Sequence, residues 1–310
     1  MAGTQGAGAA VSGPPAWVTA LAAAGSTILG GSALVAMRYA VPESDALAVS
    51  LWRQIGPALL FGAFALAVRR RMPRLSSRDL AAVIAISITQ YCIVNYLMTA
   101  SLAYITAARG ALVMSSMPLI ALGVGAAMGR ERFTLLKTLG ITVALAGIVV
   151  AIGDEAATGS SEAWKGDLLM LGATVWGGLN TVLVSPYLRR YGALPVAAIA
   201  GMVGMVACFA TVVAFGQVAA ITSFSAAGWV AVLWLAVPGG AASLYLWIWS
   251  LRHATPGRVT VAISLNPISA AVLGAMALGE AVTPHILAGL VGVVGGIVLA
   301  YWPSRGGSES

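Results

Sequence analysis

The stretch TAARGALVMSSMPLIALGVGAAMGRERF (residues 106–133) has a weak copy in TPGRVTVAISLNPISAAVLGAMALGEAV (residues 255–282), 149 residues further along the chain. The similarity continues as far as residues 153 and 302. Five pairs of identical residues mark it: Arg109 and Arg258, Pro118 and Pro267, Glu131 and Glu280, Gly140 and Gly289, and Gly147 and Gly296. The chain is therefore a duplicated unit, and its two halves meet near residue 160.

The composition places both copies in a lipid bilayer. Of the 310 residues, 59% are hydrophobic and 9% are charged, and the mean hydropathy is +0.92. A soluble core could not hide that much apolar surface. The net charge of +7 does not indicate a nucleic-acid partner, because almost all Lys and Arg residues lie in short links between apolar runs. Cys92 and Cys208 lie inside such runs, where we expect packing roles.

Ten apolar runs are long enough to cross the hydrocarbon core as helices, which takes roughly 20 residues each. The predicted fold class is an all-α membrane protein with ten transmembrane helices, five in each half. Because five is odd, the second repeat must be inverted relative to the first. The predicted spans cover residues 17–37, 46–68, 79–100, 107–128, 135–153, 166–188, 194–215, 227–250, 257–278 and 284–302.

The charged links orient these helices. With the N-terminus inside, thirteen of the seventeen Lys and Arg residues lie on the cytoplasmic side, and Arg38, Arg53, Arg109 and Lys165 lie at or towards the outside. Both termini are therefore predicted to be cytoplasmic. The predicted division is a disordered cytoplasmic tail (1–16), a first five-helix repeat (17–153), an extracytoplasmic linker (154–165), a second, inverted five-helix repeat (166–302) and a cytoplasmic tail (303–310).

The third predicted span carries many hydrogen-bonding side chains for a lipid environment: Gln90, Tyr91, Asn95, Tyr96 and Thr99. Such groups must face protein or water. Tyr91 and Asn95 lie one turn apart on one face, and Tyr96 and Thr99 lie on an adjacent face. The pattern predicts either the wall of a solute cavity or hydrogen bonds between helices, and we favour the cavity for Tyr91 and Asn95.

Aromatic residues surround a proline in the eighth predicted span. Trp234, Tyr245 and Trp249 fall within about 60° of one another on a helical wheel at ~100° per residue. Pro238 should weaken or kink the helix between them, which makes it a candidate hinge. We predict that Trp234 and Tyr245 face the cavity. The alternative is an interfacial aromatic belt, which fits Trp247 and Trp249 near the cytoplasmic end.

Two prolines interrupt matching spans of the two halves. Pro118 breaks the fourth span just after Ser115, and Pro267 breaks the ninth just after Asn266. Paired interruptions of this kind indicate a binding site or a hinge near the middle of the membrane. Ser115 and Asn266 are therefore candidate solute-binding residues, and the two prolines are candidate hinges.

Charged residues are rare inside the predicted spans. Arg53 is the only cation well inside one, and it either extends outward to the interface or pairs with Glu280; we favour the pair as a structural contact. No Asp or Glu lies at the centre of any span, where proton-driven carriers commonly place a relay carboxylate. This absence favours uniport, or coupling through peripheral groups such as His253, His285 or Glu280.

The sequence offers no catalytic arrangement. It contains no His or Cys cluster with metal-ligand spacing, no paired carboxylates at one depth, and no phosphate-binding glycine loop. The two histidines are predicted on opposite sides of the membrane. We expect no enzymatic activity, no metal and no other cofactor.

Several short motifs, in their order and spacing, resemble the ten-helix, EamA-type members of the drug/metabolite transporter superfamily. The matching pieces are Arg53, residues 73–80, residues 103–109, Pro118, residues 129–134, Trp176, Asn180, residues 245–247, residues 257–259, Asn266-Pro267, residues 278–280 and Thr283-Pro284. The resemblance implies a solute carrier of the cytoplasmic membrane, whose central cavity is lined mainly by the first, third, fourth, sixth, eighth and ninth spans. Trp176 and Asn180, one turn apart in the sixth span, thereby become candidate solute-binding residues. The first span departs from the family, because it lacks a tryptophan often found where residues 27–31 stand here.

The expected function is export of a small, partly apolar metabolite, most simply an amino acid or derivative, across a bacterial cytoplasmic membrane. Many members of the family have such substrates. Alternating access would come from rocking of spans one, two, six and seven relative to spans three, four, eight and nine. The expected partners are the solute and the lipid bilayer, with no nucleic acid, and the chain is expected to be a monomer or a homodimer. The alternatives are a carrier of drugs or quaternary amines held in an aromatic cage and a non-transporting membrane scaffold or sensor with a collapsed, dry centre.

Overall fold

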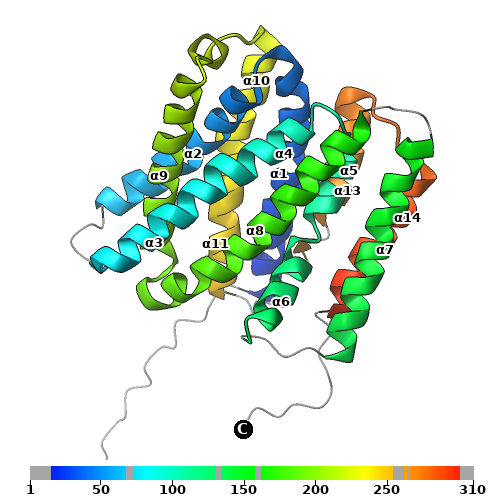
Figure 1. Cartoon of the computed structure of the whole chain (residues 1–310), viewed down its shortest axis with the longest axis horizontal. Coiled ribbons are helices and arrows are strands. Elements are labelled where there is room, and N and C mark those ends of the chain that lie inside the picture. The colour runs from blue at the N-terminus through cyan, green and yellow to red at the C-terminus, as the bar shows by residue number, and fades with distance from the viewer. Residues whose placement is uncertain are drawn as a thin grey trace, which may run out of the picture.

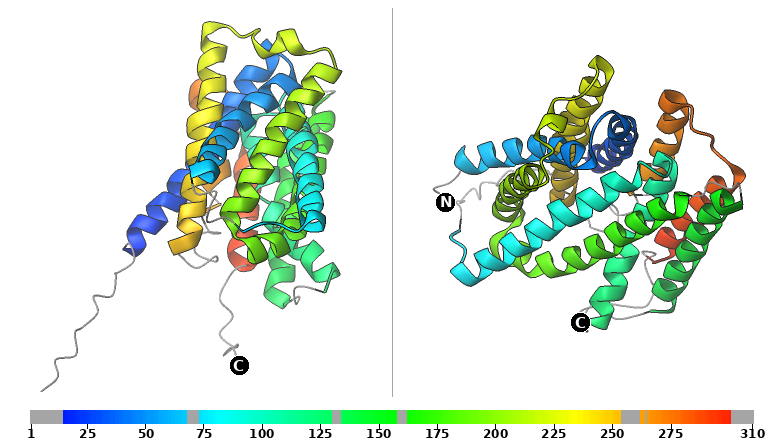
Figure 2. Two further views of the ribbon diagram at one scale, coloured as in Figure 1. Left: turned by 90° about the vertical axis from the view of Figure 1, so that its left-hand side faces the viewer. Right: turned by 45° about the horizontal axis from the view of Figure 1, so that its top comes forward.

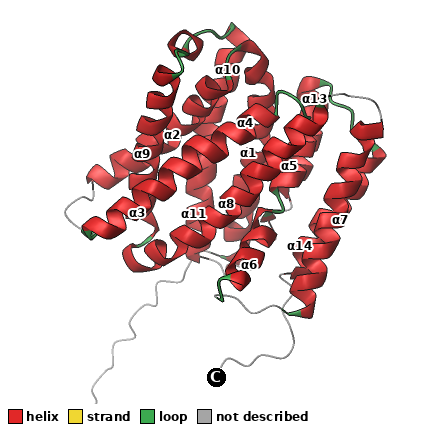
Figure 3. Cartoon of the chain, in the orientation of Figure 1, coloured by secondary structure: helices red, strands yellow, loops and turns green. Residues whose placement is uncertain are grey.

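The computed structural model describes residues 15–67, 73–129, 134–157, 162–253, 262–263 and 265–300. Within these ranges every regular element is a helix, and no strand occurs (Figure 3). This agrees with the all-α class expected from the apolar runs.

Eight of the ten predicted spans are long, apolar helical segments in the structure. Five of them are continuous helices: α1 (Ala16–Ala40), α2 (Ala46–Ala67), α7 (Leu135–Ala157), α8 (Ala163–Tyr191) and α9 (Ala193–Ala214). Three are each built from two helices: α3 (Ser77–Ile88) with α4 (Asn95–Ser101), α5 (Ala107–Met114) with α6 (Met117–Ala127), and α10 (Ala226–Ala236) with α11 (Ser243–His253).

The last two predicted spans correspond to shorter apolar helices. The helix α13 (Leu265–Leu278) has 14 residues and α14 (Pro284–Ala300) has 17. The start of the ninth predicted span, at residues 257–261, lies outside the described residues.

Hydroxyl side chains cap the N-termini of five of the described helices, including Thr134 before α7 and Thr283 before α14. Ser76 accepts a hydrogen bond from the Asp79 amide (3.2 Å), Thr106 from the Arg109 amide (3.3 Å), and Ser225 from the Gly228 amide (3.0 Å). Each bond satisfies one of the amide groups that a helix N-terminus leaves without a partner in the helix. The helices therefore begin where the apolar runs follow a Ser or a Thr.

The links gather alternately at the two ends of the bundle. The link after α1 contacts the link after α9, because the Ser44 hydroxyl donates to the Ala220 carbonyl (2.6 Å) and the Ser225 hydroxyl donates to Glu43 (2.9 Å). At the opposite end, Arg190 of α8 binds Asp79 of α3 at 2.9 Å. Successive long segments thus run in opposite directions, as membrane spans joined by short links must.

The fifth and tenth segments, α7 and α14, stand side by side at one edge of the bundle (Figures 1 and 2). A Cβ added at Gly140 would lie 2.5 Å from the Gly296 carbonyl oxygen, and one added at Gly147 would lie 2.8 Å from that of Gly289. The contacts run in opposite directions along the two helices, so the helices are antiparallel.

These glycine contacts also reflect the duplication. Gly289 is the repeat mate of Gly140, and Gly296 is the repeat mate of Gly147. Gly140 therefore touches the mate of Gly147, while Gly147 touches the mate of Gly140. Reciprocal contacts of this kind are what a two-fold axis between the repeats produces. The absent side chains let the two backbones approach closely.

Candidate functional site

Two π-helical turns interrupt the bundle at matching places. The turn η3 (Thr89–Val94) joins α3 to α4, and η5 (Val237–Ala242) joins α10 to α11. The second begins 148 residues after the first, within one residue of the repeat spacing. π-helical turns are rare and occur often at functional sites. Here each turn replaces regular helix near the middle of a long apolar segment.

A cavity of about 520 Å³ lies beside both turns. The first half contributes residues of α1, α2, η3 and the α5–α6 break, and the second half contributes residues of α8, η5, α11 and α13. This volume is within the usual range of about 300–1,000 Å³ for small-molecule sites. Its polar wall is formed by Ser26, Thr27, Arg53, Gln54, Gln90, Tyr91, Asn95, Ser115, Thr181, Ser243 and Asn266.

Four of the predicted solute-binding residues lie in this wall: Tyr91, Asn95, Ser115 and Asn266. The predicted hinge residue Pro118 lies there too, and the chain breaks between α5 and α6 just before it. These residues come from three segments far apart in sequence, which the fold brings together. Their role in binding stays a prediction.

Three other polar candidates lie outside the wall. Thr99 is fully buried and accepts a hydrogen bond from the Ser50 hydroxyl at 2.9 Å, which joins α4 to α2. Asn180 is buried behind the wall, where its amide donates to Gln90 Oε1 at 3.2 Å. Tyr96 faces a small peripheral crevice beside Cys92 and Cys208. For Thr99 the structure therefore shows hydrogen bonding between helices, which was the alternative for the third predicted span. Asn180, in the sixth span, does not line the cavity but holds the side chain of Gln90, which does.

The predicted aromatic walls are also arranged differently. The Trp234 indole donates to the Ser32 hydroxyl at 2.9 Å, and Trp234 does not line the cavity. Tyr245 and Trp249 line a separate apolar crevice, and Trp176 is exposed on the outside of α8. Trp247, which only the alternative of an interfacial belt had singled out, is the tryptophan that lines the cavity. The residues of η5 and α11 that line the cavity are Gly239, Gly240, Ser243, Leu244 and Trp247, so Tyr245 and Trp249 lie on another face of α11.

The predicted ion pair between Arg53 and Glu280 is not formed. Glu280 instead lies 3.5 Å from Arg38 and accepts a hydrogen bond from the Ala107 amide at 3.0 Å. Arg38 is in the last turn of α1, level with the link that carries Glu280, whereas Arg53 is seven residues inside α2 and lines the cavity. The difference in depth, about 10 Å along α2 at ~1.5 Å per residue, separates them.

A second charge pair, which we did not predict, lies near Glu280. Arg109 of α5 binds Asp167 of α8 through two hydrogen bonds, of 2.8 Å from Nε and 2.5 Å from Nη2. Both side chains are almost completely buried, with 2% and 7% exposed. The sequence contained a signal for this pair. Asp167 is the second residue of the sixth predicted span, Arg109 is the third residue of the fourth, and both spans begin on the same side of the membrane in the predicted topology.

We call Arg38, Glu280, Arg109 and Asp167 the clasp. Each of its two ion pairs joins a helix of the first half to a residue of the second half. Burial raises the pKa of the Glu280 carboxyl, and the Ala107 amide and the Arg38 guanidinium act in the opposite direction. The clasp holds the two halves together at one end of the bundle, beyond the cavity.

Comparison with known proteins agrees with the duplicated helical architecture. The model of the EamA-like transporter family matches residues 17–153 and again residues 164–302. The chain belongs to the EamA-like transporter family. The two matches cover the two halves that the repeated glycines and prolines define.

Relatives of this EamA-like transporter include two described as transporters. The uncharacterized inner membrane transporter YedA of Escherichia coli (strain K12) is 26% identical over 259 residues, which is 82% of this chain and 80% of that protein. The uncharacterized transporter YoaV of Bacillus subtilis (strain 168) is 21% identical over 274 residues, 88% of this chain and 93% of that protein. A solved crystal structure matches with a TM-score of 0.65 and 19% identity, over 91% of this chain and 97% of its own, and shows the same fold.

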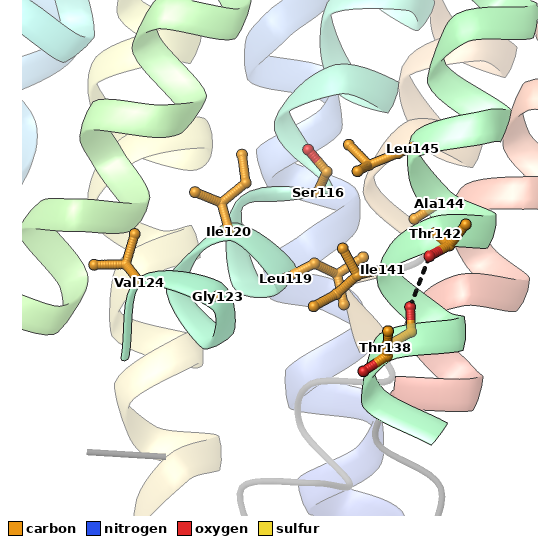
Figure 4. A pocket seen from close by; sticks show the side chains of 10 residues that line it. All are labelled: Ser116, Leu119, Ile120, Gly123, Val124, Thr138, Ile141, Thr142, Ala144 and Leu145. Carbon is orange, nitrogen blue, oxygen red and sulfur yellow. Dashed lines mark hydrogen bonds between the residues drawn. The ribbon is translucent and has the colours of Figure 1, made fainter. Parts of the chain in front are cut away.

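The EamA-like transporter also has apolar pockets on its periphery, and they differ from the cavity in chemistry. One of about 360 Å³ lies between α6 and α7, and Figure 4 shows its walls of Leu119, Ile120, Ile141 and Leu145. Its hydroxyl groups are bonded to carbonyls of their own segments, as with Thr142 and the Thr138 carbonyl at 3.0 Å. A larger pocket of about 660 Å³ between α2 and α9 is equally apolar. Such surfaces suit lipid chains, whereas the central cavity offers polar groups to a solute.

The part of the transporter that the structure describes contains no group of three His, Cys, Asp or Glu side chains placed to share a metal ion. The chemistry available in the cavity wall is hydrogen bonding from amides and hydroxyls, one guanidinium, and apolar contact with Trp247 and methionine side chains. These groups can bind and release a small molecule.

Proposed function

We propose that this transporter moves a small, partly apolar metabolite, an amino acid or a derivative, out of the cell by alternating access. The observation that carries the proposal is the polar-walled cavity of about 520 Å³ between the two halves, beside two matching π-turns. A solute of amino-acid size fits such a volume. A scaffold with a collapsed, dry centre would have no use for this cavity.

The proposed architecture is ten transmembrane helices in two inverted five-helix repeats, with both termini in the cytoplasm. The antiparallel contact of α7 and α14 supports the inversion, because non-inverted repeats would place their fifth helices parallel. The excess of Lys and Arg in the alternate links supports the orientation, which puts the clasp on the outer side. We propose a monomer or a homodimer in a bacterial cytoplasmic membrane.

In the proposed cycle the clasp closes the outer end while the cavity is reached from the cytoplasm. Opening of the outer end requires both ion pairs between the halves to separate. The breaks at Pro118, Pro238 and Pro267 would absorb the bending, since π-turns and prolines leave few helical hydrogen bonds to lose. Coupling, if any, would use peripheral groups such as Glu280, His253 or His285, without a carboxylate at mid-depth.

A carrier of drugs or quaternary amines fits the geometry less well. An aromatic cage would hold a cation between ring faces, but Trp176, Trp234 and Tyr245 do not line the cavity, and a guanidinium does. The positive charge in the wall would repel a cationic solute.

The test is solute counterflow in proteoliposomes that contain the purified protein. The panel comprises amino acids, amines and sugars, each preloaded unlabelled and assayed for uptake of the labelled form. We expect exchange of one or more amino acids and none of the sugars. Absence of exchange for every compound, by protein that remains folded, would favour the scaffold alternative.

A further inference from the structure

The cavity wall contains a positive charge that the protein does not neutralise. Arg53 lines the cavity, and its Nη1 lies 2.9 Å from the thioether sulfur of Met37, a weak acceptor. Within the described part of the chain its guanidinium forms no ion pair. Two other arginines in the apolar segments, Arg38 and Arg109, each have a carboxylate at the clasp. An unpaired cation in the wall of a cavity favours an anionic ligand.

Two amide groups in the same wall have unused hydrogen-bonding capacity. Gln54 is 3% exposed, and its Nε2 donor has no hydrogen-bond partner, although it lies near the Tyr91 hydroxyl. Asn266 contributes a buried Oδ1 acceptor that also has no partner. Both atoms are almost without accessible surface in this conformation, although both side chains line the cavity. Rotation of either side chain would present a donor of Gln54 or an acceptor of Asn266 to a solute, which would satisfy the buried group.

We propose that Arg53 and Gln54 bind the carboxylate of the transported solute, and that Asn266 Oδ1 accepts a hydrogen bond from a donor group of the same molecule. The proposal rests on the proposed function and names its substrate class: a small organic carboxylate with an apolar body and at least one N–H or O–H donor. Arg53 and Gln54 are neighbours in α2, about 100° apart around the helix axis, and both side chains line the cavity. A guanidinium with an added amide donor matches the two oxygens of a carboxylate.

The rest of the wall fits the remainder of such a molecule. Asn266 belongs to α13 of the second half, so the solute would bridge the two halves. Met114, Met117 and Trp247 supply apolar surface for its body. Methionine and tryptophan side chains accommodate apolar groups of varied shape.

The experiment uses matched probes that share one apolar side chain and differ in which charged group they carry. For leucine and for phenylalanine, the free amino acid is compared with its amide, which lacks the carboxylate, and with its deaminated acid, which lacks the ammonium donor. Binding to the purified protein is followed by thermal shift, and transport by counterflow in proteoliposomes. In the wild type we expect the amino acid to bind at least about tenfold more tightly than its amide, and the deaminated acid to fall between them.

Variants assign this preference to the guanidinium. Arg53→Gln should reduce the ratio of amino acid to amide affinity to within about twofold, and Arg53→Lys should keep part of it, because Lys retains the charge without the planar fork. Arg190→Gln is the matched control, since Arg190 is two-thirds exposed at the opposite end and lies outside the cavity. It should keep the wild-type ratio.

The outcomes separate the inference from the proposed function. If the wild-type protein binds and exchanges the amino-acid amides as well as the free amino acids, the proposed transport function is retained and the proposed carboxylate site is wrong. If Arg53→Gln keeps the full wild-type preference, the site is also wrong. If no compound of any charge is exchanged, the proposed function fails, and the inference fails with it. The wild-type comparison needs no variant, so a folding defect of Arg53→Gln does not remove the test.

Discussion

The clasp and the cavity place their positive charges in opposite situations. At the clasp, Arg109 has a buried carboxylate partner 2.5 Å away, and Arg38 has Glu280. In the cavity wall, the Arg53 guanidinium donates to the Met37 thioether and forms no ion pair within the described part of the chain. Paired buried charges hold elements in register and cost much when one member is lost. An unpaired charge stabilises nothing by itself, so its value lies in what it binds.

The largest effect should come from breaking the clasp. Asp167→Asn leaves the Arg109 guanidinium buried without a full counter-charge, which costs about 3–5 kcal/mol in folding stability. Thermal unfolding in detergent should show a large loss. Glu162→Gln is the control, because Glu162 forms an exposed pair with Lys165 and should have no measurable effect. If Asp167→Asn is as stable as the wild type, the clasp charges do not stabilise the fold, and the contrast with the cavity charge is wrong.

A smaller effect, on transport and not on stability, should come from the cavity wall. Asn95→Ala removes a polar group from the wall and should weaken solute binding about tenfold, or about 1.4 kcal/mol. Trp176→Ala removes a larger side chain that is exposed outside the cavity, and the affinity should not change. The solute affinities of both variants are measured by binding and by counterflow, with a solute that the wild type exchanges. A stronger effect of Trp176→Ala would mean that the recognition surface lies elsewhere.

The smallest effect should be the pH dependence of the clasp. Because burial raises the pKa of Glu280 in the folded protein, the folded state holds this proton more tightly than the unfolded state does. The contribution of the Glu280 carboxyl to folding stability is complete below the ordinary glutamate pKa of about 4.3, and it is lost as the pH rises through the raised pKa of the folded state. Glu280→Gln keeps an acceptor for the Ala107 amide and does not titrate.

The measurement is the difference in melting temperature between the wild type and Glu280→Gln across this pH range. We expect the wild-type advantage to decrease as pH increases. An increasing advantage would mean that Arg38 and the Ala107 amide outweigh burial, and that the carboxylate is held in its charged form.

Local features were predicted correctly where a single segment determines them. The eight long apolar segments were predicted because apolar length is a property of each segment alone. The break before Pro118 follows from the missing amide hydrogen of proline. Tyr91 and Asn95 both line the cavity although Tyr91 lies in the π-turn η3, because a separation of four residues is close to one turn of either helix type.

Faces beyond a π-turn were not predicted correctly. The helical wheel placed Trp234 and Tyr245 together by assuming ~3.6 residues per turn throughout. The turn η5 lies between them and adds a residue to the helical repeat, which rotates the later positions by about 100°. In the structure neither Trp234 nor Tyr245 lines the cavity, and Trp247 does so from the face of α11 that it shares with Ser243 and Leu244. No property of residues 237–242 except Pro238 and its glycines signals this change.

The sequence by itself determined the membrane environment, the duplication and the helical segments, since these depend on composition and on repeats along one chain. Only the tertiary structure decided the charge partners. Arg38, Arg53 and Arg109 each lie in an apolar segment, and their pairing depends on the relative depth and rotation of helices from both halves. Depth and rotation arise from side-chain packing between helices. For this reason the arginine that we expected to be structural is the one left facing the cavity.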